Sequence, residues 1–281
     1  MKEFHQMKYK ILLLVATLAL SLQASAYTIT TGGKSGAYFK VGNNLAKLVK
    51  GGKVLESKGS VENLERLVSG EADIGIVQLD AYAWYLSKHP KASAKIEIMG
   101  DLFKECIHIA VNKNGKVQDE DDLQSEGATI AIGPQGSGTA VSWDYMMKLE
   151  PGYKKSAVSF TGGSRALSKL ALNSKENKSS IDAVMWVARP DLNNKFLKIV
   201  RENPNLKMIE VDDKDLNDTY KPLGRPIYTF QHLPTKDGLF SKGKIEVPCT
   251  EAAVIARTDA DDAVLESVAD ALLSYKSTLI K

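Results

Sequence analysis

Short apolar runs alternate with amphipathic segments along most of this chain. Residues 27–31 alternate between apolar and polar positions, as a half-buried strand does, and residues 38–48 carry apolar side chains at a helical period. Residues 73–78 form an apolar run of strand length, and another helical pattern starts at Leu79. Strands that alternate with helices in this way predict an α/β protein with a parallel sheet.

The alternation of strands and helices falls into two runs, which predict two lobes. The polar, acid-rich residues 112–126 separate the runs and predict a crossing between the lobes. A last strand over residues 250–256, with the helix that closes the chain, is detached from the first run and is expected to return to it. We therefore expect a first lobe of residues 27–111 and 250–281, a second lobe of residues 112–249, and a cleft between them.

Residues 1–26 have the pattern of a secretory signal peptide. Lysines give a positive start, an apolar stretch covers residues 11–22, and Ala24-Ser25-Ala26 supplies small side chains at a cleavage site. The apolar stretch is too short to span a bilayer. We expect cleavage after Ala26 and a mature periplasmic protein that begins at Tyr27; an uncleaved signal anchor is the alternative.

Charge and cysteine content narrow the expected partners. Three lysines and one glutamate leave with the signal peptide, so the formal net charge falls from +3 to +1. The mature sequence has no cluster of basic residues, and we expect no nucleic-acid partner. Cys106 and Cys249 remain in the mature chain. An even count in an oxidising compartment permits one disulfide, and two buried free thiols are the alternative.

A Gly-rich turn between a short strand and a helix is the strongest candidate for ligand binding. Gly136, Ser137, Gly138 and Thr139 follow an apolar run and open a helical pattern. A helix start leaves backbone N–H groups unpaired and carries a positive partial charge. Such a turn holds a carboxylate or a phosphate group. The alternative is a turn whose glycines only satisfy the backbone geometry.

Further candidates follow other strands, at the sheet edge where α/β proteins bind ligands. Ser60 is expected to cap a helix, with Asn63 facing the same opening, although a capping turn without a ligand is the alternative. Gln78 and Asp80 follow a buried strand. Tyr38 and Trp186 are expected to cover the apolar part of a solute. The candidate ligand-binding residues are Gly36, Tyr38, Ser60, Val61, Asn63, Gln78, Asp80, Gly136, Ser137, Gly138, Thr139 and Trp186.

Catalytic, metal and cofactor patterns are absent from the sequence. It contains no Gly-x-Ser-x-Gly elbow, and the spacing around residues 33–35 does not fit a phosphate-binding P-loop. The histidines of the mature chain, His89, His108 and His232, lack zinc spacing. Val141 stands where a Gly-x-Gly-x-x-Gly fingerprint needs its third glycine. We therefore expect neither an enzyme, nor a cofactor, nor a metal site.

Several of these segments resemble one family, the TAXI-type solute-binding proteins of tripartite ATP-independent periplasmic (TRAP) transporters. The most specific match is Gly59-Ser60-Val61-Glu62-Asn63-Leu64. The turns at residues 31–38, 72–80 and 133–139, and the later strand at residues 181–183, are also similar and occur in the family's order.

The resemblance implies a type II periplasmic binding protein fold that closes on a small solute. It also implies delivery to membrane subunits driven by an ion gradient, commonly sodium, and ligands such as glutamate and related acids. The chain departs from the family at Phe39-Lys40, where Tyr-Pro is usual, and at Lys58, where glycine is usual. These lysines flank the expected cleft, so the resemblance does not determine the identity of the solute.

The leading hypothesis is a monomeric periplasmic binding protein for a small carboxylate, such as an amino acid or a dicarboxylate. Asp80 is the expected partner of a solute ammonium group, and Arg165, Arg189 and Arg225 are candidates for a second carboxylate. The alternatives are a carrier of a phosphate-like oxyanion, an exported sensor or host-surface factor with the same fold, and a secreted hydrolase.

Overall fold

The computed structural model describes residues 26–173, 180–234 and 243–281. The expected signal peptide, except for Ala26, lies outside these residues, and β1 begins at the next residue, Tyr27. No helix in the described part of the chain is long and apolar enough to cross a membrane.

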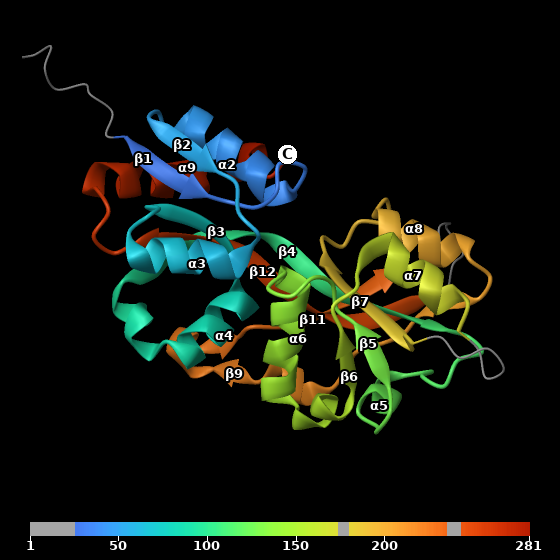
Figure 1. Ribbon diagram of the computed structural model, residues 1–281. Coiled ribbons are helices and arrows are strands. Elements are labelled where there is room, and N and C mark those ends of the chain that lie inside the picture. The colour runs from blue at the N-terminus through green and yellow to red at the C-terminus, as the bar shows by residue number, and fades with distance from the viewer. Residues whose placement is uncertain (1–25, 174–179, 235–242) are drawn as a thin grey trace, which may run out of the picture.

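A ten-stranded mixed sheet forms the centre of the described structure (Figure 1). Its main path runs in the order β2-β1-β3-β12-β4-β7-β5-β6, with β11 beside β12 and β8 beside β4. A small antiparallel pair, β9 and β10, stands apart. The strands are β1 (Tyr27–Thr30), β2 (Gly52–Leu55), β3 (Ile74–Gln78), β4 (Ile96–Asn112), β5 (Thr129–Ala131), β6 (Ala157–Ser159), β7 (Ala183–Ala188), β8 (Leu206–Met208), β9 (Thr219–Tyr220), β10 (Arg225–Pro226), β11 (Thr229–Pro234) and β12 (Lys244–Arg257).

Helices follow the strands of both ends of the sheet, which form the two lobes. The first lobe contains β1, β2 and β3, and the second contains β5, β6 and β7; within each lobe these strands are parallel. The helices are α2 (Ala37–Leu48), α3 (Ser60–Ser69), α4 (Leu79–Lys88), α5 (Glu120–Leu123), α6 (Gly138–Leu149), α7 (Gly163–Ala171), α8 (Lys195–Glu202) and α9 (Asp262–Leu279). Four short 3-10 helices are η2 (Pro90–Ala94), η3 (Pro151–Lys155), η4 (Lys214–Asn217) and η5 (Lys221–Leu223).

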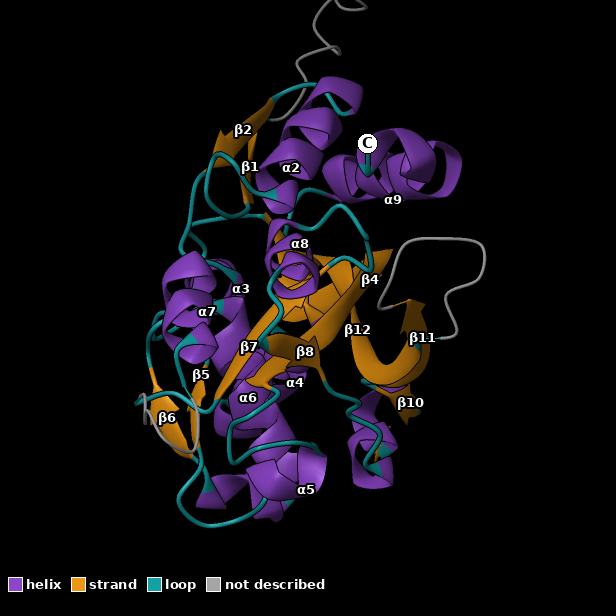
Figure 2. Ribbon diagram, turned by 90° about the vertical axis from the view of Figure 1, so that its right-hand side faces the viewer, coloured by secondary structure: helices purple, strands orange, loops and turns teal. Residues whose placement is uncertain are grey.

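Two long strands, β4 and β12, connect the lobes (Figures 1 and 2). They pair with each other from Ile96 to Cys106 of β4, and β12 also pairs with β3 of the first lobe. From Cys106 onward β4 pairs with β7 of the second lobe. The crossing to the second lobe therefore lies inside β4, before the polar residues 112–126 that the sequence indicated. The last strand, β12, pairs with β3, and the closing helix α9 packs on α2.

Glycines shape the turns that precede the helices of the parallel strands. Gly59, before α3, has a φ of +135°, and Gly136, before α6, has a φ of +77°, which side chains with a Cβ rarely adopt. Ser137 then caps α6 by accepting a hydrogen bond from the amide of Ala140. The starts of α3, α4 and α6 consequently lie at the carboxyl ends of the strands, where α/β sheets bind ligands.

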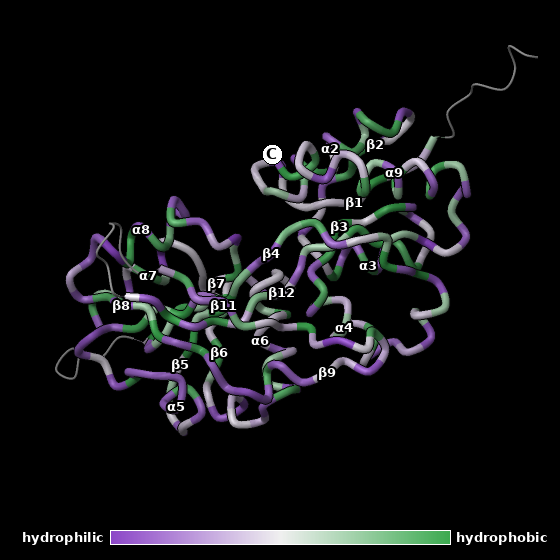
Figure 3. The backbone as a smooth tube through the Cα atoms, turned by 180° about the vertical axis from the view of Figure 1, so that it is seen from behind, coloured by the Kyte–Doolittle hydropathy of each residue, from purple (hydrophilic) through white to green (hydrophobic). Residues whose placement is uncertain are grey.

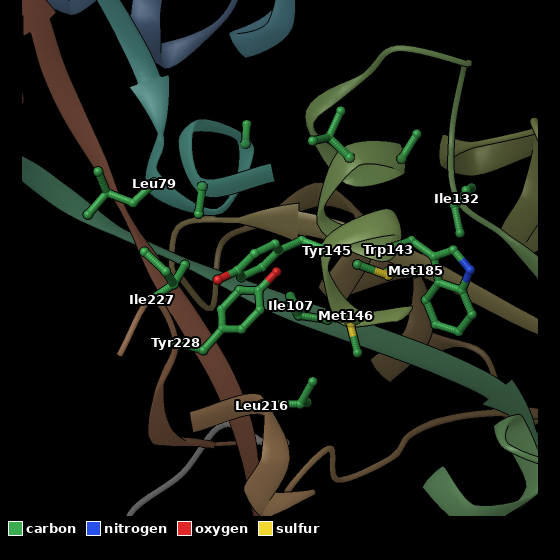
Figure 4. Close-up of a cluster of buried hydrophobic side chains, with 14 of the residues drawn as sticks. Leu79, Ile107, Ile132, Trp143, Tyr145, Met146, Met185, Leu216, Ile227 and Tyr228 are labelled. Atoms are coloured by element: carbon green, nitrogen blue, oxygen red, sulfur yellow. The ribbon is translucent and has the colours of Figure 1, made fainter. Parts of the chain in front are cut away.

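The apolar core continues from the first lobe into the second. Leu79 of α4, Ile107 of β4 and Tyr145 of α6 belong to one cluster of buried side chains. Figure 4 shows Tyr145 beside Tyr228, and their ring centroids are 5.8 Å apart. Hydrophobic segments follow the central strands, while hydrophilic ones lie mainly at the periphery (Figure 3). The lobes are thus packed together along α4 and α6.

Cys106 and Cys249 form a disulfide, so the alternative of two free thiols is wrong. The two cysteines are register partners in β4 and β12. The bond therefore joins the two connecting strands at the point where β4 leaves β12 and begins to pair with β7.

Candidate functional site

The starts of α3 and α6, one from each lobe, lie next to each other. A Cβ atom on Gly59 would lie 3.9 Å from the amide nitrogen of Gly138. A Cβ atom on Gly138 would lie only 2.0 Å from Oε1 of Gln78, at the end of β3. Three of the expected turns, containing Gly59, Gln78 and Gly138, therefore lie close together.

The start of α6 retains unused donors toward this meeting point. The amides of Gly138 and Thr139 occupy the first helical positions, which have no intrahelical acceptor, and neither bonds elsewhere in the described chain. The hydroxyl of Thr139 accepts a hydrogen bond from the amide of Val187 at 3.2 Å, which holds the helix start against β7. Ser137 and Gly138 are partly exposed, so solvent reaches these groups.

Ser60 and Tyr38 connect the first-lobe side of the site. The hydroxyl of Ser60 accepts a hydrogen bond from the amide of Gln78 at 3.0 Å. The same hydroxyl lies close enough to Tyr38 to oppose the rise that burial causes in the pKa of Tyr38. The Tyr38 hydroxyl in turn donates a 2.5 Å hydrogen bond to Oε2 of Glu105, in the connecting strand β4.

Glu105 is a site residue that the sequence did not reveal. It is half-buried, and burial raises its pKa to about 7, with a further rise from the charge of Asp80. The hydrogen bond from Tyr38 and the charge of Arg189 act in the opposite direction. Thr250 is the register partner of Glu105 in β12, so both side chains lie on one face of the sheet. No sequence motif marks either residue, because they are distant in the sequence and only the pairing of β4 with β12 brings them together.

Asp80 lies between the lobes, with its carboxylate already engaged. Its Oδ1 accepts from the amide of Ala81, and its Oδ2 accepts from the hydroxyls of Ser142 at 2.5 Å and Tyr228 at 2.9 Å. Burial raises its pKa, and these hydrogen bonds oppose the rise. Asp80 therefore ties α4 to α6, and it is fully buried, so the ammonium role expected for it would require the packing between these helices to open.

Asn63 is occupied within the first lobe. Its Oδ1 accepts from Thr30 Oγ1 at 2.7 Å, and its Nδ2 donates to the carbonyls of Thr31 and Ile76. These three bonds link α3 to β1 and β3 in a fully buried position. Asn63 thus positions the start of α3, and it does not present a free polar group to a solute.

Trp186 lies on the face of the sheet opposite Val187, away from the meeting point of the helix starts. Its ring stacks on His108 with centroids 5.3 Å apart and contacts Phe196 edge-on. It belongs to the core beneath α7 and α8, and it is only 4% exposed. The structure therefore assigns Trp186 to second-lobe packing, in place of the solute contact that we expected.

The remaining predicted residues lie at the rims of the turns. Gly36 precedes α2 and donates to the carbonyl of Gly33 at 2.7 Å. Val61 is partly buried against the core cluster that spans both lobes. Gly136 is exposed and forms the turn before α6.

The three candidate arginines differ in their surroundings. Arg225 binds both carboxylate oxygens of Asp101 at 3.0 Å, and Arg165 is exposed at the start of α7. Arg189 follows β7; its guanidinium lies 4.7 Å from the ring centroid of Phe103 and donates to the carbonyl of Ile280. Arg189 also lines an open groove of about 630 Å³, together with Phe103, Lys104, Pro190, Asp191, Leu192 and Asn193.

The described groups support binding chemistry better than catalysis. His108 donates a hydrogen bond from Nδ1 to the carbonyl of Cys106, and burial lowers its pKa to about 4, so the imidazole is a weak base. Among described residues, Glu150, Asp213 and Asp215 bring carboxylate oxygens within 4.8 Å of one another. Glu150 and Asp213 already accept hydrogen bonds from neighbouring groups, and Asp215 is exposed, so we assign no metal there.

Comparison with solved structures identifies the fold. The chain is similar to AbpA of Streptococcus pneumoniae, an amino acid ABC transporter substrate-binding protein bound to L-arginine, at 15% identity and a TM-score of 0.51, with 90% of each chain covered. YhfZ of Shigella flexneri matches at 15% identity and 0.51, with 94% of each chain covered. XAC2383 of Xanthomonas citri, bound to ATP, matches at 14% and 0.50, covering 91% of this chain and 86% of that one. The fold is that of two-lobe periplasmic solute-binding proteins, as predicted.

A family model places the chain more specifically. The model of the NMT1-like family matches residues 29–255, from Ile29 in β1 to Ile255 in β12. The match includes the turns at Gly59, Gln78 and Gly138 and both connecting strands. The chain therefore belongs to the NMT1-like family.

Proposed function

We propose that this protein is the periplasmic solute-binding component of a TRAP-type transporter, and that it carries a small carboxylate solute between its lobes. The observation that carries the proposal is the approach of Gly59 and Gly138, at the starts of α3 and α6. Two positive helix ends from different lobes favour an anionic group between them.

The amides of Gly138 and Thr139 are the proposed donors to the solute carboxylate. Ser60 and Gln78 approach from the first lobe and orient the solute. A solute that contacts both lobes favours their closed arrangement by its higher affinity for that arrangement. Such a site needs no catalytic group, in agreement with a transport protein that is not an enzyme.

The signal-peptide pattern of residues 1–26 supports the proposed periplasmic location. We propose that the signal peptide is removed after Ala26, which leaves Tyr27 as the first residue of the mature chain and of β1. The proposed lobes comprise residues 27–111 with 250–281, and residues 112–249. The pairing of β4 with β7 begins at Cys106, a few residues inside the first of these ranges.

TRAP membrane subunits are the proposed partners, on the resemblance of the turns at residues 31–38, 59–64, 72–80 and 133–139 to the TAXI proteins. Solute uptake into vesicles that contain these subunits should then require a sodium gradient and no ATP. Uptake that needs ATP hydrolysis would instead assign the protein to an ABC transporter.

Binding is tested on the protein purified from the periplasm. Mass spectrometry of the denatured sample identifies any co-purified molecule, and N-terminal sequencing checks the cleavage site. Thermal shifts are then measured with amino acids, dicarboxylates and phosphate. We expect a carboxylate to raise the melting temperature, and Thr139→Ala to reduce that shift.

The matched control is Ser87→Ala, which changes an exposed serine of α4 whose hydroxyl donates to the carbonyl of Trp84. It should leave the ligand-induced shift unchanged. A shift with phosphate but with no carboxylate would favour the oxyanion carrier, and no shift with any of these solutes would contradict the proposed function.

A further inference from the structure

Glu105 presents a carboxylate that is only partly satisfied at the proposed site. Its Oε2 accepts from Tyr38, while Oε1 has no hydrogen bond and the side chain has no ion pair within the described chain. The residue is half-buried, so it is neither sealed in the core nor freely hydrated. An ionised carboxylate in this position is stabilised when a positive partner arrives.

Thr250 adds a second unsatisfied group beside Glu105. Its side chain is 0% exposed, and Oγ1 has no hydrogen-bond partner among the residues that the structure describes. Buried hydroxyls are nearly always paired in folded proteins. Because Thr250 and Glu105 are register partners, this hydroxyl lies on the same face of the sheet as the carboxylate.

The two sides of the site have opposite electrostatic character. The starts of α3 and α6 are positive, whereas Glu105 lies in the field of the second carboxylate, Asp80. Arg189 is the cation that also acts on Glu105, but its guanidinium is stacked on Phe103 and bonded to the chain near its C-terminus. A solute with separate negative and positive groups matches this arrangement.

We propose that Glu105, supported by Tyr38 and Thr250, selects solutes that carry an ammonium group. Glu105 Oε1 accepts from the ammonium group, Thr250 Oγ1 accepts a second hydrogen bond from it, and the solute carboxylate lies at the amides of Gly138 and Thr139. This inference rests on the proposed function and refines its solute class to amino acids, with dicarboxylates that lack nitrogen excluded. It also transfers the ammonium role to Glu105 from Asp80, which is fully buried and already accepts three hydrogen bonds.

The direction of the Tyr38 bond supports an acceptor role for Glu105. Tyr38 donates to the carboxylate, which stabilises its ionised form. A protonated Glu105 that donated to a second solute carboxylate would lose this support, although the negative charge of Asp80 favours protonation. The alternative is nevertheless a distinct outcome of the experiment, because it predicts tighter binding of the dicarboxylate.

The experiment compares matched solutes by titration calorimetry. Each L-amino acid that shifts the melting temperature is paired with the acid that lacks its amino group, for example L-glutamate with glutarate and L-alanine with propionate. We expect the amino acid to bind about 10- to 100-fold more tightly than its partner, as a charge-assisted hydrogen bond implies. Glu105→Gln should remove most of that difference, since the amide still accepts from Tyr38.

Two further variants make the test specific. Glu97→Gln removes an exposed charge from the same strand and should leave both affinities unchanged. Thr250→Val keeps the shape of the side chain and removes only the orphaned hydroxyl. It should not lower the melting temperature without solute, yet it should weaken amino acid binding about tenfold.

The outcomes separate this inference from the function on which it rests. If glutarate or another deaminated acid binds as tightly as its amino acid, or if Glu105→Gln weakens both equally, the inference is wrong while carboxylate binding stands. If no carboxylate of either set binds, the result contradicts both this inference and the proposed function. A larger affinity for the dicarboxylate would assign Glu105 the donor role instead.

Discussion

The hydroxyl of Ser142, in the second lobe, donates a 2.5 Å hydrogen bond to the carboxylate of Asp80, in the first. Asp80 is fully buried, so the bond cannot be replaced by water without local rearrangement. Ser142→Ala should therefore lower the free energy of unfolding by about 1.5–3 kcal/mol, the usual value for a hydrogen bond to a charged group. Urea unfolding followed by circular dichroism measures the change.

The exposed Ser87 again supplies the control. Ser87→Ala should change stability by less than about 0.5 kcal/mol. An equally small loss for Ser142→Ala would show that the contact between Asp80 and Ser142 does not stabilise the packed lobes.

Gly138→Ala tests how closely the starts of the helices approach. The added methyl group would meet the side chain of Gln78, which is only 5% exposed and cannot turn freely into solvent. We expect a loss of about 1–3 kcal/mol in unfolding free energy, typical of an overpacked site, and a smaller solute-induced melting shift.

Gly100→Ala is the matched substitution in β4. A Cβ atom at Gly100 would lie 3.5 Å from Leu272, an ordinary contact. It should leave the solute-induced shift unaltered. If Gly138→Ala behaves in the same way, α6 does not approach Gln78 as closely in solution.

The disulfide between Cys106 and Cys249 should make a large contribution to stability, because 143 positions separate the two residues. Closing so long a loop restricts the unfolded chain, and native disulfides typically contribute about 2–5 kcal/mol. Replacing both cysteines by alanine should lower the urea midpoint accordingly. Dithiothreitol should lower the midpoint of the wild-type protein and leave that of the variant unchanged; an unchanged wild-type midpoint would contradict the prediction.

Glu105 should give stability a distinct pH dependence. Its pKa is raised to about 7 in the folded protein, from an ordinary value of 4.5, so the folded state holds the proton more tightly than the unfolded state. Its contribution therefore favours folding at low pH and is lost as pH rises toward and through about 7. The free energy of unfolding of Glu105→Gln, minus that of the wild type, should therefore increase as the pH rises from about 4.5 to about 8.

The difference between the two proteins, measured at each pH, isolates this contribution. It cancels those of Glu120, whose pKa is also raised to about 7, and of His108, whose pKa is lowered to about 4. A difference that does not vary with pH would mean that Glu105 is hydrated as in the unfolded chain.

Local chemistry made the Gly-rich turns predictable from the sequence. Gly59 and Gly136 adopt backbone angles that favour glycine, and Ser137 caps the helix that follows it. These signals depend on neighbours in the chain, so they indicated the helix starts and their ligand-binding edge. The meeting of Gly59 with Gly138 followed from the placement of all such starts at one edge of the sheet.

Long-range pairing determined what the sequence could not show. Polar residues such as Lys104 and Glu105 separate the apolar runs at residues 96–99 and 107–111, but the structure joins both runs in the single strand β4. Trp186 lies in a wholly apolar strand, where alternation does not reveal which face a side chain takes. The partners of Asp80 come from distant segments that no local pattern connects.

The bond between Cys106 and Cys249 lies one residue pair away from Glu105 and Thr250. The disulfide fixes the register of β4 and β12 beside these two side chains. Their relative position therefore stays the same when the rest of the molecule rearranges. Any opening has to come from torsions elsewhere in the connecting segments. In the packed arrangement Thr250 is fully buried, so a solute would reach the pair only once the lobes separate, and it would then meet the same fixed spacing before the lobes close.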